Sequence, residues 1–186
     1  MSKNNNEIKH EDLIMKKAMD VFAEEGLKFF GINQKVKDSS STEIVVLEAL
    51  NLHMDYTFLM EDDSYIHFEF QTTNKGKLDL RRFRVYESVL SLQKDKDVKT
   101  YVVYSGNIKS AKDTLETGIN KYKVKSIFMS DKNGDLIVEE LENKVKNKEN
   151  ITKQELVALT FTPIMGGKLT KAEKNNKINK NSKIIR

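Results

Sequence analysis

The chain has 186 residues, of which 38% are apolar and 32% are charged, so it is long enough for a folded domain and too polar for an ordinary membrane-spanning protein. It contains no cysteine, which excludes disulfides, thiolate nucleophiles and Cys-ligated zinc. Any metal must therefore be held by carboxylates, His or water. The formal net charge of +4 only weakly favours a nucleic-acid partner.

The positive charge is concentrated at the C-terminus. Residues 168–186 hold seven Lys and Arg against one Glu, so this segment carries +6 and residues 1–167 carry −2. The basic residues recur at every third position among abundant Asn, a spacing that would spread them around the circumference of a helix. We therefore expect one domain over residues 1–167 and a basic, disordered tail over residues 168–186, which would make only salt-sensitive phosphate contacts.

The N-terminal residues do not resemble an export signal, and we expect none there. Met1–His10 lacks an apolar block, and charged residues interrupt the apolar runs elsewhere well short of the roughly 18 residues that a spanning helix needs. We expect a cytoplasmic protein without a membrane partner, whose oligomeric state the sequence does not indicate.

The first expected elements are a helix and a strand. Glu11–Phe30 has apolar residues at spacings of mostly three and four, which predicts an amphipathic helix with Gly26 and Gly31 as candidate stop signals. After a polar stretch, the β-branched run Ile44–Leu47 is typical of a strand that is at least partly buried.

A β-hairpin is the clearest local prediction. Asp55–Met60 and Tyr65–Gln71 are rich in Tyr, Thr, Phe and Ile, and the polar segment Glu61–Ser64 between them has the composition of a tight turn. The next segments, Leu78–Leu92 and Val98–Tyr104, predict a helix and a strand, so that a crossover joins the hairpin to a mixed sheet. The expected fold class is therefore α/β, with helices flanking a mixed central sheet.

The remaining segments predict shorter elements. Lys125–Met129 indicates a strand, and Val138–Val145 and Thr152–Leu159 indicate short helices. Pro163, together with the glycines at 166 and 167, is expected to end the ordered structure.

A polar row on the second hairpin strand is the main candidate site. His67, Glu69 and Gln71 alternate with apolar residues, so they share one face of the strand while the apolar side chains share the other, which we expect against a helix. Asp55 on the adjoining strand can add a second carboxylate. Two carboxylates this close favour a divalent cation or a shared proton, and Mg²⁺ bound by one Asp and one Glu supports phosphodiester hydrolysis by an activated water.

The hairpin register tests this hypothesis. With a two- or four-residue loop, Asp55 would pair with Phe70 and face the wrong side of the sheet. With a three-residue loop or a bulge, Asp55 lies across from Gln71 or from Glu69, and the carboxylates meet.

The segment His53–Phe58, the acidic turn and the segment Ile66–Thr72 resemble the PD-(D/E)XK nuclease family transposases, also called recombination-promoting nucleases. The likeness continues through Arg81–Glu87, Thr100–Gly106 and Leu159–Gly166, and covers roughly residues 10–167. It implies a restriction-endonuclease-like core that binds Mg²⁺ or Mn²⁺ and cuts DNA in a recombination or mobile-element setting. It also implies catalytic residues Asp55, Glu69 and Gln71, of which Asp55 and Glu69 are the metal ligands.

The residue at position 71 departs from the general motif, which has lysine there. The neutral amide of Gln71 can orient a water but adds no positive charge, for which Lys75, Lys77 and Arg81 are alternative sources. An upstream acidic ligand, from the first expected helix or from Glu43 or Glu48, is also left open.

Three other interpretations of these residues stay open. His53 and His67 are expected on the same strand faces as Asp55 and Glu69, and this arrangement allows a zinc or manganese site. The chain can also be a nucleic-acid-binding relic that no longer cuts, or a truncated copy, since the related proteins continue with more helices. In an interaction or regulatory module, Glu69 would instead be paired with Arg81 or Arg84.

Overall fold

The computed structural model describes residues 13–40, 43–46 and 50–182, and the side chains among them except those of residues 40–52 and 180–182. These residues form two compact units. One comprises residues 34–104 and 110–127, and the other comprises the N-terminal residues to 33, residues 105–109 and residues 128 onward. No helix in the described part of the chain is long and apolar enough to cross a membrane.

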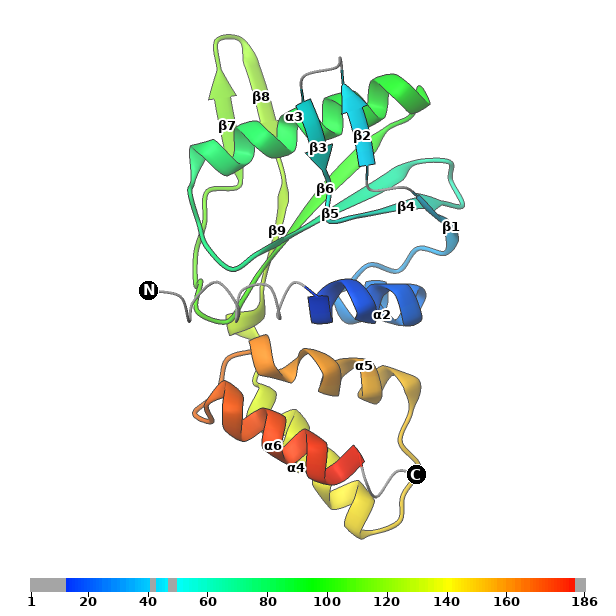
Figure 1. Cartoon of the computed structure of the whole chain (residues 1–186), viewed down its shortest axis with the longest axis vertical. Helices are drawn as coiled ribbons and strands as arrows, with labels where there is room; N and C mark the ends of the chain where they lie inside the picture. The colour runs from blue at the N-terminus through cyan, green and yellow to red at the C-terminus, as the bar shows by residue number, and fades with distance from the viewer. Residues whose placement is uncertain (1–12, 41–42, 47–49, 183–186) are drawn as a thin grey trace. The chain divides into compact units, whose positions relative to one another are not determined.

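The first unit contains a mixed β-sheet of five strands in the order β1-β4-β5-β6-β9 (Figure 1). Strands β1 and β4 and strands β4 and β5 pair antiparallel, whereas β5 and β6 pair parallel. The predicted α/β class and the mixed sheet are confirmed. The elements of this unit are β1 (Val36–Ser40), β2 (Glu43–Val46), β3 (Leu50–His53), β4 (Tyr56–Met60), β5 (Tyr65–Gln71), α3 (Lys77–Lys94), β6 (Val98–Tyr104), β7 (Thr114–Thr117), β8 (Asn120–Lys123) and β9 (Lys125–Phe128).

Several strands differ from the sequence-based prediction. The predicted strand at Ile44–Leu47 is present as β2, but it pairs with β3 in a separate two-stranded ribbon. The polar stretch before it contains β1, an edge strand of the main sheet, although its residues have no apolar alternation. The ribbon β7–β8 was not predicted, because its Glu, Asn and Lys residues are uncommon in strands.

The β4–β5 hairpin has a three-residue loop. Met60 N donates to Ser64 O at 2.8 Å, and Asp63 adopts a left-handed φ of 60°. Compared with a two- or four-residue loop, this loop shifts the pairing of the two strands by one residue. The register pairs Tyr56 with Phe68 and Thr57 with His67. Continued by one residue, it sets Asp55 across from Glu69, which is one of the two registers that the carboxylate hypothesis requires.

Helix α3 covers the face of β5 that carries the polar row. Tyr86 and Leu90 pack with Tyr65, which lies on the same face of β5 as His67 and Glu69. The helix predicted for Leu78–Leu92 is present as α3, and its apolar stripe has Leu80, Phe83, Tyr86 and Leu90 buried and Val89 partly buried. The polar row is therefore enclosed by a helix, whereas the sequence analysis placed a helix only against the apolar face.

The second unit is helical. It contains a helix over residues 13–21, α2 (Ala23–Phe29), η1 (Met129–Asp131), α4 (Gly134–Lys146), α5 (Lys153–Phe161), η2 (Thr162–Ile164) and α6 (Lys171–Ser182). The single helix predicted for residues 11–30 is interrupted at Phe22. Gly26 lies inside α2 and does not stop it, whereas Gly31, with a φ of 78°, follows its end. Phe161 joins α5 to α2 through ring contacts with Phe29 and Phe30.

Helix α5 begins with a capping box. Thr152 Oγ1 accepts from Glu155 N at 3.2 Å, and Glu155 Oε2 accepts from Thr152 N at 2.9 Å, so two backbone N–H groups that lack helical partners are satisfied. We expect Thr152→Ala to lower the free energy of unfolding by about 1 kcal/mol. Urea unfolding followed by circular dichroism measures this loss, and Thr152→Ser should retain the wild-type value.

The predicted disorder of the C-terminal tail is wrong for residues 171–182, which form α6. Ordered structure therefore continues past Pro163 and the two glycines. The Lys174 side chain is 2% exposed, and its ammonium donates to Met165 O at 3.0 Å and Gly166 O at 2.9 Å and lies 3.5 Å from Asp135 Oδ1. One lysine of the basic series is thus a buried structural residue. The nuclease-like domain expected over residues 1–167 stays a prediction.

Candidate functional site

The polar row of β5 is buried in the first unit. His67 is 0% exposed, Glu69 2% and Gln71 8%. Because β6 pairs parallel with β5, it sets Thr100 beside His67 and Tyr104 beside Gln71. Burying a carboxylate without compensation is costly, so the partners of Glu69 decide what this row can do.

Glu69 accepts hydrogen bonds on both carboxylate oxygens. His67 Nε2 lies 2.9 Å from Oε1, while Gln71 Nε2 and Arg82 Nη2 each donate to Oε2 at 3.3 Å. Arg82, in the second turn of α3, also lies 4.0 Å from Asp79 and over the ring of Tyr86. An arginine partner for Glu69 was one of the open interpretations, but the residue is Arg82 and not Arg81 or Arg84.

Asp55 lies immediately before β4 and accepts a hydrogen bond from Phe70 N at 2.7 Å through Oδ2. This bond holds the carboxylate against the end of β5. The pKa of Tyr86 is raised by burial and then by the charges of Glu69 and Asp55. Asp55 and Glu69 therefore act electrostatically on the same phenol, as expected of two carboxylates on neighbouring strands.

A hydrogen-bonded chain leads from Glu69 to α3 and β8. His67 Nδ1 lies 3.3 Å from Thr100 Oγ1, Thr100 is hydrogen-bonded to Glu87, and Tyr122 OH donates to Glu87 Oε2 at 3.3 Å. Burial lowers the pKa of His67 to about 4, and burial raises the pKa of Glu87. Sequence reasoning missed Thr100, Glu87 and Tyr122, because only the parallel pairing of β6 with β5 brings Thr100 to His67.

The proposed substitutes for the motif lysine lie at the start of α3 and within its first turns. Lys75 and Lys77 flank the start of α3, where Lys75 N donates to Asp79 Oδ2 at 2.7 Å. Arg81 lines a pocket together with Arg84, and Glu69 is not among the residues that line this pocket. The cation that does reach Glu69 is Arg82, which was not among the candidates. The side chains of Glu43 and Glu48 lie outside the described residues.

The pair Asp55 and Glu69 suits a hard divalent cation. Mg²⁺ commonly takes one or two carboxylates, completes its shell with water and substrate phosphate, and prefers oxygen ligands. Arg82 bonds Glu69 Oε2, yet its side chain is 42% exposed, so it can withdraw when a cation binds. Among the described residues, which include Asp55, His67 and Glu69 as well as His53, no group of three or more His, Cys, Asp and Glu is arranged to hold a metal ion.

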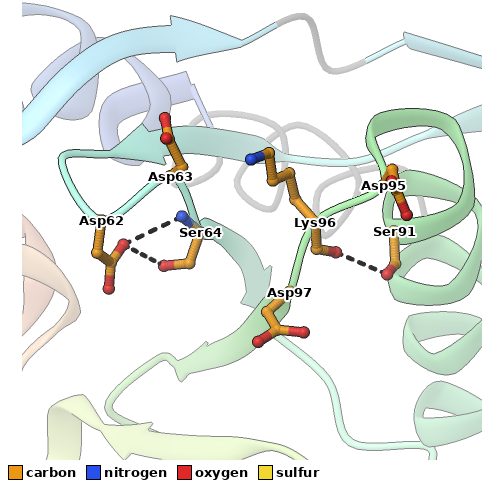
Figure 2. Close-up of a pocket in the computed structure, with 7 residues that line it drawn as sticks. All are labelled: Asp62, Asp63, Ser64, Ser91, Asp95, Lys96 and Asp97. Carbon is orange, nitrogen blue, oxygen red and sulfur yellow. Dashed lines mark hydrogen bonds between the residues drawn. The ribbon is translucent and has the colours of Figure 1, made fainter.

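A pocket at the other end of β5 gathers acidic residues (Figure 2). It is lined by Asp62, Asp63, Ser64, Ser91, Asp95, Lys96 and Asp97. Two of its four acids have partners, since Asp62 Oδ1 accepts from both Ser64 N and Ser64 Oγ and Asp63 pairs with Lys37 at 3.1 Å. These contacts stabilise the hairpin loop, and in the α3–β6 connection Ser91 Oγ donates to Lys96 O at 2.7 Å.

Comparisons with protein-family models, with curated proteins and with solved structures found no match to this chain. The residues and their geometry are therefore the basis for any functional conclusion.

Proposed function

We propose that this protein is a metal-dependent DNA endonuclease of the PD-(D/E)XK type, with Asp55 and Glu69 as the ligands of Mg²⁺ or Mn²⁺. The observation that carries the proposal is the hairpin register, which sets Asp55 across from Glu69. The resemblance of the motif supports the substrate class and a setting in DNA recombination or transposition within the cytoplasm. The restriction-endonuclease-like core is part of the same proposal.

The chain's own residues would divide the work as follows. Asp55 and Glu69 would hold the cation, which when bound lowers the pKa of a water and neutralises charge on the scissile phosphate. Gln71, whose amide already donates to Glu69 at 3.3 Å, would orient a water. Arg82 would turn from Glu69 towards the phosphate and supply the positive charge that lysine provides in the general motif.

Exposed basic side chains of the first unit would bind the DNA backbone. Arg81 is exposed on α3, and Lys121 and Lys123 are exposed on β8. Arg84 Nη1 donates to Thr117 Oγ1 at 2.6 Å, which ties α3 to the β7–β8 ribbon that carries these lysines. Contacts of this kind would give affinity that falls steeply with salt and carries little sequence information.

One observation favours a second candidate, a nucleic-acid-binding relic that no longer cuts. Glu69 is 2% exposed and its oxygens are bonded to His67, Gln71 and Arg82, an arrangement that also suits a structural ion pair. In this case the basic surface would still bind DNA while the carboxylates bind no cation.

Nicking of supercoiled plasmid separates these two candidates. We expect cleavage with Mg²⁺ or Mn²⁺, none with EDTA, and a loss of at least about 100-fold in Asp55→Ala, because a ligand matters at least as much as its supporting residues. Asp131→Ala is the matched control, since Asp131 is an exposed residue of η1 in the helical unit. DNA retention without cleavage by the wild-type protein would establish the relic.

A further inference from the structure

A second pocket of the first unit gathers positive charge at the β9 edge of the main sheet. It has a volume of about 460 Å³, and its lining comes from α3, from β6 and from the point where β8 leads into β9. The lining residues are Glu87, Val98, Lys99, Thr100, Tyr101, Lys123, Val124 and Lys125. Three lysines against one carboxylate favour an anionic ligand. Neither Asp55 nor Glu69 is among these residues, so the pocket is distinct from the candidate metal site.

The three lysines of this pocket are exposed and only loosely engaged. Lys125 Nζ lies 5.4 Å from the centroid of the Tyr101 ring, and Lys123 Nζ lies 3.8 Å from Asp113 Oδ2. Exposed contacts of this length contribute little and can be exchanged for a stronger partner. A phosphate monoester carries a charge of about −1.5 to −2 at neutral pH and three acceptor oxygens, so it suits three ammonium groups better than a carboxylate does.

Glu87 adds a hydrogen-bond acceptor to the positively charged lining. Thr100 Oγ1 and Tyr122 OH both donate to Glu87 Oε2, the second at 3.3 Å. Within the described part of the chain, no donor is bonded to the other oxygen, Oε1, and this atom is not fully buried. Because both donors use Oε2, the lone pairs of Oε1 are available to a ligand.

The rest of the lining is partly apolar. Val98 and Val124 both line the pocket, and Val124 is 3% exposed. The volume is within the range of about 300–1,000 Å³ that is common for small-molecule sites. Glu87, Val98 and Lys99 also line an adjoining pocket of about 720 Å³, so there is room for a ligand longer than a single phosphate ester.

We propose that this pocket binds a nucleoside 5′-phosphate, with the phosphate at Lys99, Lys123 and Lys125 and an exocyclic amine of the base donating to Glu87 Oε1. A nucleotide combines the groups that suit the lining: a multiply charged anion, a flat ring with apolar faces, and a hydrogen-bond donor. A free nucleotide and the 5′-phosphorylated end of a DNA strand both present this chemistry. A strand end as the source rests on the proposed nuclease function, whereas the nucleotide site itself does not.

Titration calorimetry in the presence of EDTA tests the site without cleavage. The probes are dAMP, the same purine nucleotide without the amine (purine 2′-deoxyriboside 5′-monophosphate) and inorganic phosphate. We expect dAMP to bind about 10-fold or more tightly than the nucleotide without the amine, because hydrogen bonds to a charged group are among the stronger ones. Inorganic phosphate should bind more weakly than either nucleotide.

Glu87→Gln should remove the preference for the amine while keeping the pocket. The amide oxygen can continue to accept from Thr100 and Tyr122, which places the NH₂ group where Oε1 was, facing the amine of dAMP donor to donor. We therefore expect the preference for dAMP to disappear in this variant. Glu116→Gln, at an exposed residue paired with Lys121, is the matched control and should keep the preference.

Removing the three lysines should have a different effect from removing the acceptor. We expect the triple variant Lys99→Gln/Lys123→Gln/Lys125→Gln to bind dAMP about 10-fold or more weakly, since the charge-assisted contacts to phosphate are lost. The control with the same change of charge is a triple variant of exposed lysines in the helical unit, and it should bind dAMP as the wild type does. Its substitutions are Lys146→Gln, Lys153→Gln and Lys168→Gln.

Equal affinity of the wild type for the two nucleotides would overturn the proposal, as would equal losses in the two triple variants. Inorganic phosphate that binds as tightly as dAMP would also overturn it, because the lysines would then hold any phosphate. A 5′-phosphorylated oligo(dA) that binds more tightly than dAMP would identify a strand end as the source, and weaker binding would identify a free nucleotide. If the wild-type protein cleaves no DNA, the nuclease proposal fails, while these titrations still decide the nucleotide site.

Discussion

Replacing Lys174 by methionine is expected to lower the stability of the helical unit by about 2–4 kcal/mol and to release α6. The substitution keeps most of the apolar stem but leaves Met165 O and Gly166 O without their ammonium donor. It also leaves Asp135, whose side chain is 22% exposed, without its cation. Hydrogen exchange of the α6 amides and urea unfolding of the whole chain measure both effects.

Lys177→Met is the matched control for this experiment. Lys177 is three residues away on the same helix, its side chain is 39% exposed, and its ion pair with Glu142 spans 3.4 Å. Exposed pairs of this kind contribute about 1 kcal/mol or less. Equal and small effects of the two substitutions would mean that the buried ammonium does not hold α6 in place.

Replacing Glu69 by glutamine is expected to abolish both metal-dependent cleavage and metal-dependent stabilisation. The amide has nearly the same shape, and its oxygen can still accept from Arg82 while its NH₂ group faces His67 Nε2, which must then be the unprotonated ring nitrogen. The amide lacks the negative charge that attracts a divalent cation. In the wild type, binding of Mg²⁺ or Mn²⁺ to the folded state should raise Tm as the metal concentration exceeds Kd. Thermal melts with a series of metal concentrations measure this shift, independently of DNA.

The control for the thermal melts is Glu116→Gln, which changes the same charge at an exposed site paired with Lys121. It should retain the full metal-dependent shift. A shift of equal size in Glu69→Gln would place any bound cation elsewhere. A missing shift in the wild type, together with a destabilised Glu69→Gln, would favour the structural ion pair of the relic.

Local patterns were sufficient for the elements around the candidate site. The period-two alternation of Tyr65–Gln71 and the apolar stripe of Leu78–Leu92 each correspond to an element, since one strand face and one helix face must be buried. The acidic turn also correctly indicated a hairpin. Composition alone did not distinguish a three-residue loop from a two- or four-residue loop, because Asp63 adopts its left-handed φ only in the folded hairpin.

The partners of Glu69 could not be predicted from the sequence. The sequence offers three arginines close together, at positions 81, 82 and 84. Only the rotation of α3 over the sheet decides that Arg82 reaches the carboxylate. The apolar alternation of β5 also suggested that just one of its faces meets a helix. That inference failed because a central strand is buried on both faces, and polar groups are accepted there when they are hydrogen-bonded to one another.

The sequence by itself determined which residues carry polar chemistry on β5, that the fold mixes helices with a sheet, and that any metal must use oxygen or imidazole ligands. Only the tertiary structure decided the register that, continued by one residue, sets Asp55 across from Glu69. It also decided that Thr100 contacts both His67 and Glu87, and that Lys174 donates to Met165 O. The reason is the range of the interactions. Periodicity reports which face of an element is buried, whereas a buried hydrogen bond depends on a partner that the chain supplies from a distant segment.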